Sequence, residues 1–194
     1  MSDRSIHIVF ALFPGVTQLD FTGPHQVFSR LPDATVTAAS LGGQVIEADD
    51  LTFSGLARLE DIEVCDVLCV PGGWGTNLAV LDEAYLSEIR RLAANARYLT
   101  SVCTGSLVLG AAGLLKGRRA ACHWAARDLL ASFGAIADPA RVVRDGHVFT
   151  GGGVTAGIDF ALTLAAELAD PETAQTIQLS LEYAPAPPFS SGRP

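Results

Sequence analysis

The sequence predicts an α/β protein with a mainly parallel central sheet and helices on both of its faces. Segments 6–13 and 64–70 are nearly continuous apolar runs, which is typical of parallel strands that are buried on both sides. Segments with helical spacing alternate with these runs, and such alternation favours strand–helix–strand units. Proline and glycine follow both runs, at 14–15 and 71–73, so each run ends in a loop.

The first third of the chain is expected to hold two strands, one helix and a hairpin. Pro24 can occupy the first turn of a helix, and we expect that helix over 25–31, ended by Pro32. β-branched residues favour a second strand over 35–39. Two glycines within 41–46 predict a turn that leads into a short hairpin arm.

The middle of the chain continues the same alternation. Asp82 suits the N-cap position of a helix, and the apolar spacing that follows predicts a helix over 81–94. A strand is expected over 98–102, and it runs directly into a small-residue helix over 105–115. Segment 123–133 also has helical spacing.

The last part of the chain is expected to end the sheet and add two helices. An Asp-Gly pair predicts the turn of a hairpin over 142–150. Three glycines then lead into a helix over 156–168, and a proline opens a last helix over 171–181. The tail 183–194 is rich in proline and serine and is expected to be irregular.

Length and composition predict one ordered domain, 1–194, without a nucleic-acid or membrane partner. The chain is 49% hydrophobic and 18% charged, which argues against disorder, and its net charge of −8 argues against nucleic-acid binding. The apolar run 6–13 is too short to span a membrane and lacks the basic leader of a signal peptide. The four cysteines suit a reduced, cytoplasmic protein, and their spacing matches no usual zinc pattern, so we expect no metal.

Cys103 is the strongest candidate for a reactive residue. It lies where the strand over 98–102 should turn sharply into the helix over 105–115, an arrangement like the nucleophile elbow of hydrolases with Cys in place of Ser. Free N–H groups at the start of that helix should stabilise a thiolate and lower the pKa of the thiol. The alternative is a buried structural cysteine, which is the common fate of this residue type. Cys65, Cys69 and Cys122 have apolar neighbours and are expected to be inert.

Asp20 is the candidate acid or base. It stands between Leu19 and Phe21, in an apolar setting that is unusual for a carboxyl group. It could cap the following helix, or it could face Cys103 in a loop cluster at the carboxyl edge of the sheet. A carboxylate and a thiolate cannot both be charged cheaply at close range, so the pair should share one proton. With the thiolate favoured by the helix, we expect that proton mostly on Asp20.

Other residues of the same loops complete the predicted site. Gly72 and Gly73 let the backbone approach a ligand and could aim N–H groups at it, or they could simply form the turn after the strand. Thr104 could donate its N–H to an anionic intermediate and its hydroxyl to Asp20 or Cys103, or it could cap a helix. The predicted apolar pocket is lined by Phe21, Trp74 and Val154, with His123 nearby as a base or a structural histidine.

Several motifs together resemble the ThiJ/PfpI superfamily. They are Phe-Pro-Gly at 13–15, Leu-Asp-Phe-Thr-Gly-Pro at 19–24, Val-Pro-Gly-Gly at 70–73, Ser-Val-Cys-Thr-Gly at 101–105, Cys-His-Trp at 122–124 and Thr-Gly-Gly-Gly-Val-Thr-Ala-Gly-Ile-Asp at 150–159. Within the superfamily, the chain is most similar to isocyanide hydratases, through segments 19–24, 103–105 and 183–189. The resemblance implies a flavodoxin-like fold, a homodimer, and hydration of an isocyanide to an N-substituted formamide without a cofactor.

That reaction suits the two candidate catalytic residues. The resemblance implies that Cys103 adds to the terminal carbon of the isocyanide and that Asp20 protonates this carbon, giving a thioimidate on the cysteine. Asp20 would then activate water, which attacks the same carbon, and the formamide would leave as the thiolate is expelled. General acid–base help of this kind is typically worth about 10²–10⁴-fold.

Two other functions remain open from the sequence. Many superfamily members have His after the nucleophile and Glu in the first-helix region, whereas this chain has Thr104 and Asp20. These differences argue against a cofactor-independent glyoxalase or deglycase. The same core also serves as the sensory half of AraC-type transcription regulators, which carry a further helix-turn-helix module of about 100 residues, a common domain size. A non-catalytic small-molecule sensor is therefore the second alternative.

Overall fold

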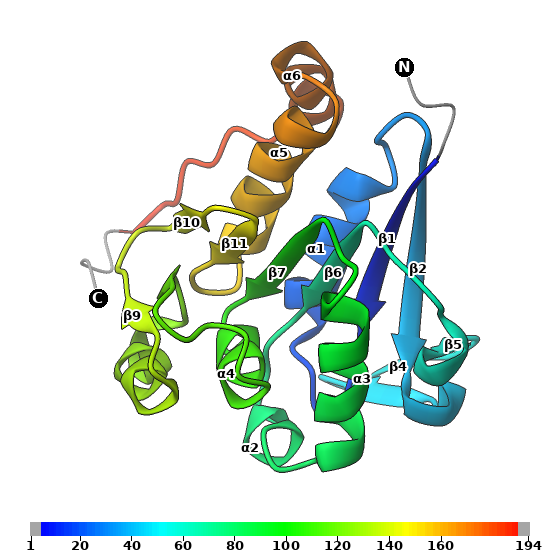
Figure 1. Cartoon of the computed structure of the whole chain (residues 1–194). Coiled ribbons are helices and arrows are strands. Elements are labelled where there is room, and N and C mark those ends of the chain that lie inside the picture. The colour runs from blue at the N-terminus through cyan, green and yellow to red at the C-terminus, as the bar shows by residue number, and fades with distance from the viewer. Residues whose placement is uncertain (1–4, 190–194) are drawn as a thin grey trace.

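The computed structural model describes residues 5–189 and is built around a seven-stranded sheet (Figure 1). The strands are, in sheet order, β10 (Val142–Asp145), β11 (Val148–Gly151), β7 (Tyr98–Val102), β6 (Val67–Val70), β1 (Ile6–Ala11), β2 (Ala34–Ser40) and β5 (Ala57–Arg58). Neighbouring strands are parallel except for the β10–β11 hairpin. The predicted α/β class with a mainly parallel sheet is confirmed.

Helices cover both faces of this sheet, as expected. Helices α1 (Gln18–Phe28) and α5 (Ala156–Leu168) pack together on one face, and α6 (Pro171–Ser180) packs on α5. Helices α3 (Glu83–Ala93) and α4 (Gly105–Ala111) lie on the other face, with α2 (Thr76–Ala79) beside α4.

The central strands are apolar along their whole length because they feed two cores. In β1, Val9 and Ala11 belong to the core beneath α3 and α4, whereas Ile8 and Phe10 belong to the core beneath α1 and α5. Successive side chains of a strand point to opposite faces, so a strand that serves two cores must be apolar at every position.

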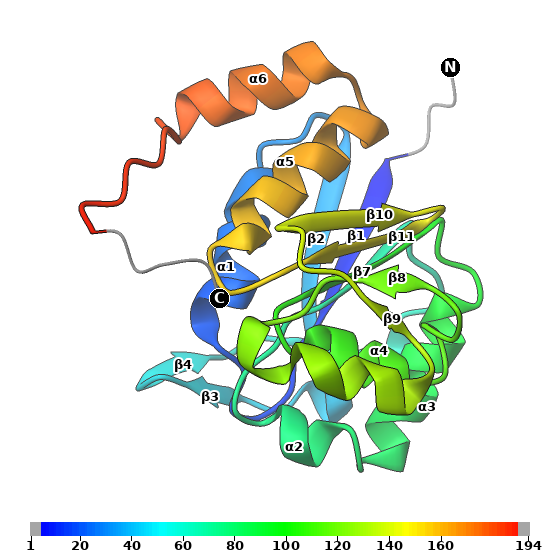
Figure 2. The same cartoon turned by 90° about the vertical axis from the view of Figure 1, so that its left-hand side faces the viewer.

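Short elements complete the fold. The predicted hairpin arm is present as β3 (Ile46–Ala48) and β4 (Leu51–Phe53), which Figure 2 shows at the edge of the molecule below α1. A second small sheet joins β8 (Arg119–Ala120) to β9 (Ile136–Ala137). Segment Trp124–Phe133 is a 3₁₀ helix. Two further 3₁₀ turns, Leu41–Gly43 and Leu59–Asp61, flank β5 and the hairpin arm.

The first helix differs from the prediction. It begins at Gln18, and Pro24 lies inside it rather than at its start. A proline in a helix removes one backbone hydrogen bond, which disfavours it unless packing compensates. Here Pro24 packs where α1 crosses α5: a Cβ added at Gly157 would lie 3.2 Å from its Cδ, so the two helices meet through small residues. With this tertiary contact, the helix begins at Gln18, about two turns before the predicted start at residue 25.

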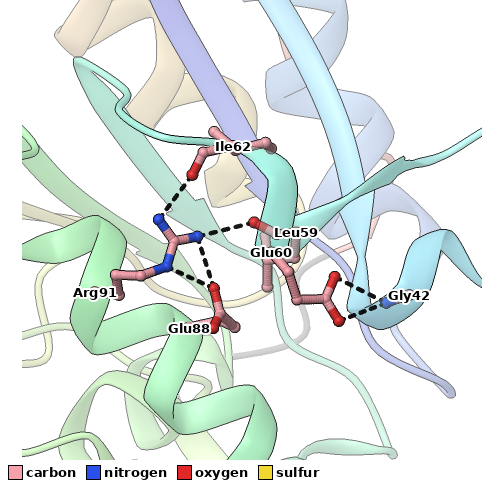
Figure 3. Close-up of polar contacts among 6 residues, drawn as sticks. All are labelled: Gly42, Leu59, Glu60, Ile62, Glu88 and Arg91. Carbon is pink, nitrogen blue, oxygen red and sulfur yellow. Dashed lines mark hydrogen bonds and ion pairs between the residues drawn. The ribbon is translucent and has the colours of Figure 1, made fainter.

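One arginine fixes the segment that leads into β6 (Figure 3). Arg91 of α3 donates from Nη1 to the carbonyl of Ile62 at 2.8 Å and from Nη2 to that of Leu59 at 3.0 Å. Its Nε donates to Glu88 at 2.7 Å, and the neighbouring Glu60 accepts the N–H of Gly42. These bonds give the carbonyl of Ile62 a partner and the carbonyl of Leu59 a second donor besides the N–H of Ile62, and they hold the segment against α3.

The end of the described chain is irregular, as predicted. No helix or strand follows α6 up to residue 189, and residues 190–194 lie outside the described part of the chain. Tyr183 ties the start of the tail to α5, because its hydroxyl donates to Asp159 at 2.9 Å. Within residues 5–189, no helix is long and apolar enough to cross a bilayer.

Candidate active site

Cys103 lies at a sharp turn between β7 and α4, at the carboxyl edge of the sheet. Its φ angle is +57°, a left-handed conformation that residues other than glycine seldom adopt. The N–H of Cys103 still donates to the carbonyl of Gly151 at 3.0 Å, so the sheet holds the strained residue in place. Only 5% of Cys103 is exposed. The geometry is that of the predicted nucleophile elbow.

Two loops from neighbouring strands are joined by backbone hydrogen bonds beside Cys103. The N–H of Thr17 donates to the carbonyl of Gly72 at 2.8 Å, and the N–H of Gly75 donates to that of Gly15 at 3.0 Å. The loop after β1 is thus fixed to the loop after β6. Because Asp20 lies in the first turn of α1, directly after the first of these loops, its position relative to the second is fixed as well.

Asp20 is completely buried and points to the second loop. Its Oδ2 accepts the N–H of Gly72 at 3.0 Å, whereas no N–H or O–H of the described residues donates to the buried Oδ1. Asp20 does not cap α1, because Thr17 is the N-cap residue and Asp49 accepts the N–H of Gln18. The capping alternative is therefore wrong, and the carboxyl group faces the thiol of Cys103 instead.

The surroundings of this pair oppose the expected protonation. Burial raises the pKa of Asp20 to about 6, although its contacts with Cys103 and Gly72 oppose the rise. Burial and the nearby Asp20 carboxylate raise the pKa of Cys103 to about 12, and only the N–H of Thr104 opposes this. Both shifts favour a shared proton on sulfur and an ionised Asp20. Burial and the carboxylate therefore oppose the low thiol pKa that the helix N–H groups led us to expect.

Gly72 and Gly73 serve the site indirectly. The N–H of Gly72 donates to Asp20, and the N–H of Gly73 donates to the hydroxyl of Thr104 at 2.9 Å. Both N–H groups therefore have partners within the protein, and the expectation that they point at a ligand was wrong. The hydroxyl of Thr104 contacts Gly73 and Thr76 rather than Asp20 or Cys103. At Gly72, a Cβ would lie 2.5 Å from the nitrogen of Thr104, so only glycine fits between Asp20 and the elbow.

A cavity of about 350 Å³ is lined by Cys103. Three predicted pocket residues line it, namely Trp74, His123 and Val154. Phe21 does not. It packs edge-on against Phe10 in the core beneath α1 and borders a separate hollow beside the hairpin arm. This prediction was wrong because Phe21 follows Asp20 on a helix, where adjacent side chains point in different directions.

Part of the cavity wall was not predicted. The predicted site residues Gly73, Cys103 and Thr104 also line the cavity, and the lining residues that were not predicted are Thr17, Thr76, Asn77, Leu107, Ala125, Ala126 and Leu129. No Asp, Glu, Lys or Arg is among them. Thr76 is the residue that the sequence could have revealed, because it is a polar residue three positions beyond the glycine pair that ends β6.

His123 is the N-cap residue of the 3₁₀ helix Trp124–Phe133. Its Nδ1 accepts the N–H of Ala125 at 3.3 Å and so caps the 3₁₀ helix that follows. Its ring also lies 5.7 Å from that of Trp124. Because Nδ1 is occupied as an acceptor, the neutral imidazole carries its proton on Nε2.

Comparison with known proteins places the chain in a family. The model of the DJ-1/PfpI family matches residues 6–167, which include Asp20, the glycine pair and the Cys103 elbow. The chain belongs to the DJ-1/PfpI family. The predicted ThiJ/PfpI resemblance is thereby confirmed, and so is the flavodoxin-like arrangement of sheet and helices.

This DJ-1/PfpI protein matches a different share of each relative's length. It is 57% identical to "Isonitrile hydratase" of Pseudomonas putida over 98% of this chain and 84% of that protein. It is 32% identical to "HTH-type transcriptional regulator CdhR" of Pseudomonas aeruginosa over 90% of this chain but only 53% of the regulator. Among solved structures, a ThiJ/PfpI family protein from Pseudomonas syringae superposes with a TM-score of 0.94 at 44% identity, covering 97% of this chain and 79% of that one.

Proposed function

We propose that the protein is an isocyanide (isonitrile) hydratase, a lyase that converts R–N≡C and water to R–NH–CHO. The observation that carries the proposal is the pair formed by the Cys103 elbow and the buried Asp20 beside an uncharged cavity. The 57% identity to the P. putida isonitrile hydratase, over nearly the whole chain, supports the same reaction.

In the first half of the reaction, Asp20 acts as a base and then as an acid. Its carboxylate takes the thiol proton as the sulfur of Cys103 forms a bond to the terminal carbon of the isocyanide. That carbon gains electron density, and the protonated Asp20 returns the proton to it. The product is the thioimidate R–N=CH–S on Cys103, and Asp20 is a carboxylate again. The raised pKa of Asp20, about 6, suits a group that must both take and give a proton near neutral pH.

In the second half, Asp20 performs the same two transfers with water. It takes one proton from water as the oxygen adds to the thioimidate carbon, and it delivers that proton to the substrate nitrogen. The carbon–sulfur bond then breaks, the hydroxyl becomes the formyl carbonyl, and its proton returns to the sulfur. One water is consumed and the thiol is regenerated, so the sequence needs no cofactor.

The test is formamide production from a panel of uncharged isocyanides. We expect turnover by the wild-type protein and none above background by Cys103→Ala. The absence of formamide from every member of the panel would overturn the proposal.

A small-molecule sensor is the second candidate, because the P. aeruginosa regulator matches 90% of this chain. A sensor would bind an isocyanide or form an adduct on Cys103 without releasing a product. Intact-mass spectrometry with excess substrate distinguishes the two functions. A stable adduct without formamide favours the sensor, whereas free thiol with accumulating formamide favours the hydratase.

We further propose that the chain acts as a single domain, in a homodimer, in the reducing cytoplasm. Three large apolar side chains of segment 74–81 are exposed, namely Trp74, which lines the cavity, Leu78 and Leu81, with Trp74 88% exposed. Such a group of exposed apolar side chains is typical of a protein–protein interface. Light scattering should give twice the 20.3 kDa mass of one chain, and a mass of one chain at micromolar concentration would contradict the dimer.

A further inference from the structure

Two threonine hydroxyls meet at the wall of the Cys103 cavity. Oγ1 of Thr76, at the start of α2, lies 2.8 Å from Oγ1 of Thr104, at the elbow. Thr76 is only 3% exposed, and both residues line the cavity. A buried hydroxyl that lacks its partner is costly, so this contact restrains both side chains.

The remaining contacts of the Thr104 hydroxyl show what Thr76 adds. That oxygen accepts the N–H of Gly73 at 2.9 Å, and the carbonyl of Gly73 lies at the longer distance of 3.3 Å. The N–H of Gly73 therefore holds the Thr104 hydroxyl as an acceptor. The proton of that hydroxyl can be donated to the Thr76 hydroxyl or to the Gly73 carbonyl, and the Thr76 hydroxyl is the nearer of the two. Removing the Thr76 hydroxyl would leave Thr104 tied to Gly73 alone.

The position of Thr104 matters because its backbone N–H favours negative charge on Cys103. Every other contribution to the thiol, namely burial, Asp20 and Cys122, opposes that charge. The N–H must stay aligned with the sulfur while the thiolate forms and again when it is expelled. A rotation of Thr104 would weaken this contact without removing any group that touches the substrate.

We propose that Thr76 is a positioning residue for the reaction, which holds Thr104 so that its N–H stays on the Cys103 sulfur. The proposal rests on the proposed hydratase function for its kinetic consequence. Its effect on the thiol, however, can be measured without any isocyanide. A structural role alone would lower stability but leave the chemistry of Cys103 unchanged.

The experiment compares Thr76→Val, Thr76→Ser and Thr100→Val with the wild-type protein. Valine removes the hydroxyl at nearly constant size, and serine restores it. Thr100→Val is the matched control, since Thr100 is also buried and its hydroxyl donates to the carbonyl of Leu68 at 2.9 Å, but it does not line the cavity. The readouts are kcat/KM for formamide production, the rate of Cys103 alkylation by iodoacetamide with peptide mapping, and the thermal midpoint.

We expect Thr76→Val to lower kcat roughly tenfold with little change in KM, and to slow Cys103 alkylation roughly threefold at fixed pH, the size of one lost hydrogen bond. Thr76→Ser should recover most of both rates. Thr100→Val should lower the thermal midpoint and leave both rates near those of the wild type. Unchanged alkylation in Thr76→Val, or equal losses in the valine and serine variants, would overturn the positioning role. If the wild-type protein makes no formamide, the hydratase function fails, and the alkylation rates alone decide the role of Thr76.

Discussion

The N–H of Gly72 donates to Oδ2 of Asp20 at 3.0 Å and so fixes a buried carboxyl group from the first turn of α1 beside the nucleophile elbow. This bond, together with the Thr17–Gly72 backbone contact, joins the loops after β1 and β6. The carboxyl group therefore cannot move away from the Cys103 thiol without breaking the joined loops. The site depends on Gly72 as much as on the two residues that would perform the chemistry.

Gly72→Ala should damage the site severely. The added Cβ would lie 2.5 Å from the Thr104 nitrogen and 2.9 Å from Oδ2 of Asp20, and the first neighbour is backbone that cannot yield without moving the elbow. We expect a loss of stability of about 1–3 kcal/mol, typical of overpacking, and a large loss of turnover. Gly152→Ala is the control, because its nearest neighbour would be an ordinary 3.5 Å away. Similar unfolding midpoints for the two variants would contradict this account.

Arg91→Ala should lower stability without altering the chemistry. The side chain donates to the backbone carbonyls of Ile62 and Leu59, and without it Leu59 would keep only the N–H of Ile62, at 3.3 Å. We expect a decrease of about 1–3 kcal/mol in the free energy of unfolding, measured in urea. Arg58→Ala, which removes an exposed pair with Asp61, should change it by less than about 0.5 kcal/mol. Equal effects of the two substitutions would show that the Arg91 contacts contribute little.

Asp20→Asn should stabilise the protein at alkaline pH. The folded-state pKa of Asp20 is about 6, above its ordinary value of 3.8, so folding favours the protonated form. Ionisation in the folded protein therefore costs stability as pH rises from about 4 to about 6, by up to about 3 kcal/mol. Asparagine mimics the protonated group. Urea unfolding should show the variant more stable than the wild type at about pH 8, with the difference vanishing near pH 4. A constant difference across this range would contradict the raised pKa.

Turnover should depend on the ionisation of Asp20. Because the carboxylate takes the thiol proton in the proposed first step, kcat/KM should rise with pH through about 6 and then level off. The measurement is kcat/KM from about pH 4 to about pH 9 at constant ionic strength. A profile that falls through pH 6 would instead require protonated Asp20 at the start, with the thiolate formed beforehand.

The sequence predicted the sheet and most helices because their signals are local or depend on burial of whole strands. The apolar runs of β1 and β6 are signals of buried strands, and the Asp82 cap is a local signal. Asp82 indeed accepts the N–H of Tyr85. Pro24 was misplaced because its tolerance inside α1 depends on Gly157, a residue far along the chain. Contacts of this kind have no local signal.

The candidate site shows the same division. Cys103 and Asp20 stood out because their residue types are unusual in their surroundings. The protonation of the pair could not be predicted, because it depends on how deeply both groups are buried, and burial opposes the effect of the helix N–H groups. Thr76 and Leu129 were missed as wall residues because only the folded chain brings α2 and the 3₁₀ helix around the cavity that Cys103 lines.

The most direct test of the mechanism measures turnover and Cys103 alkylation together in Asp20→Asn. Without the carboxylate, no group passes the proton between sulfur, carbon and nitrogen, so kcat/KM should fall by roughly 10²-fold or more. Loss of the Asp20 charge should at the same time lower the pKa of Cys103, so alkylation should be as fast as in the wild type or faster. Lost turnover with an intact, reactive thiol is the result that the account predicts. Turnover near the wild-type value in Asp20→Asn would contradict it and would require another proton carrier.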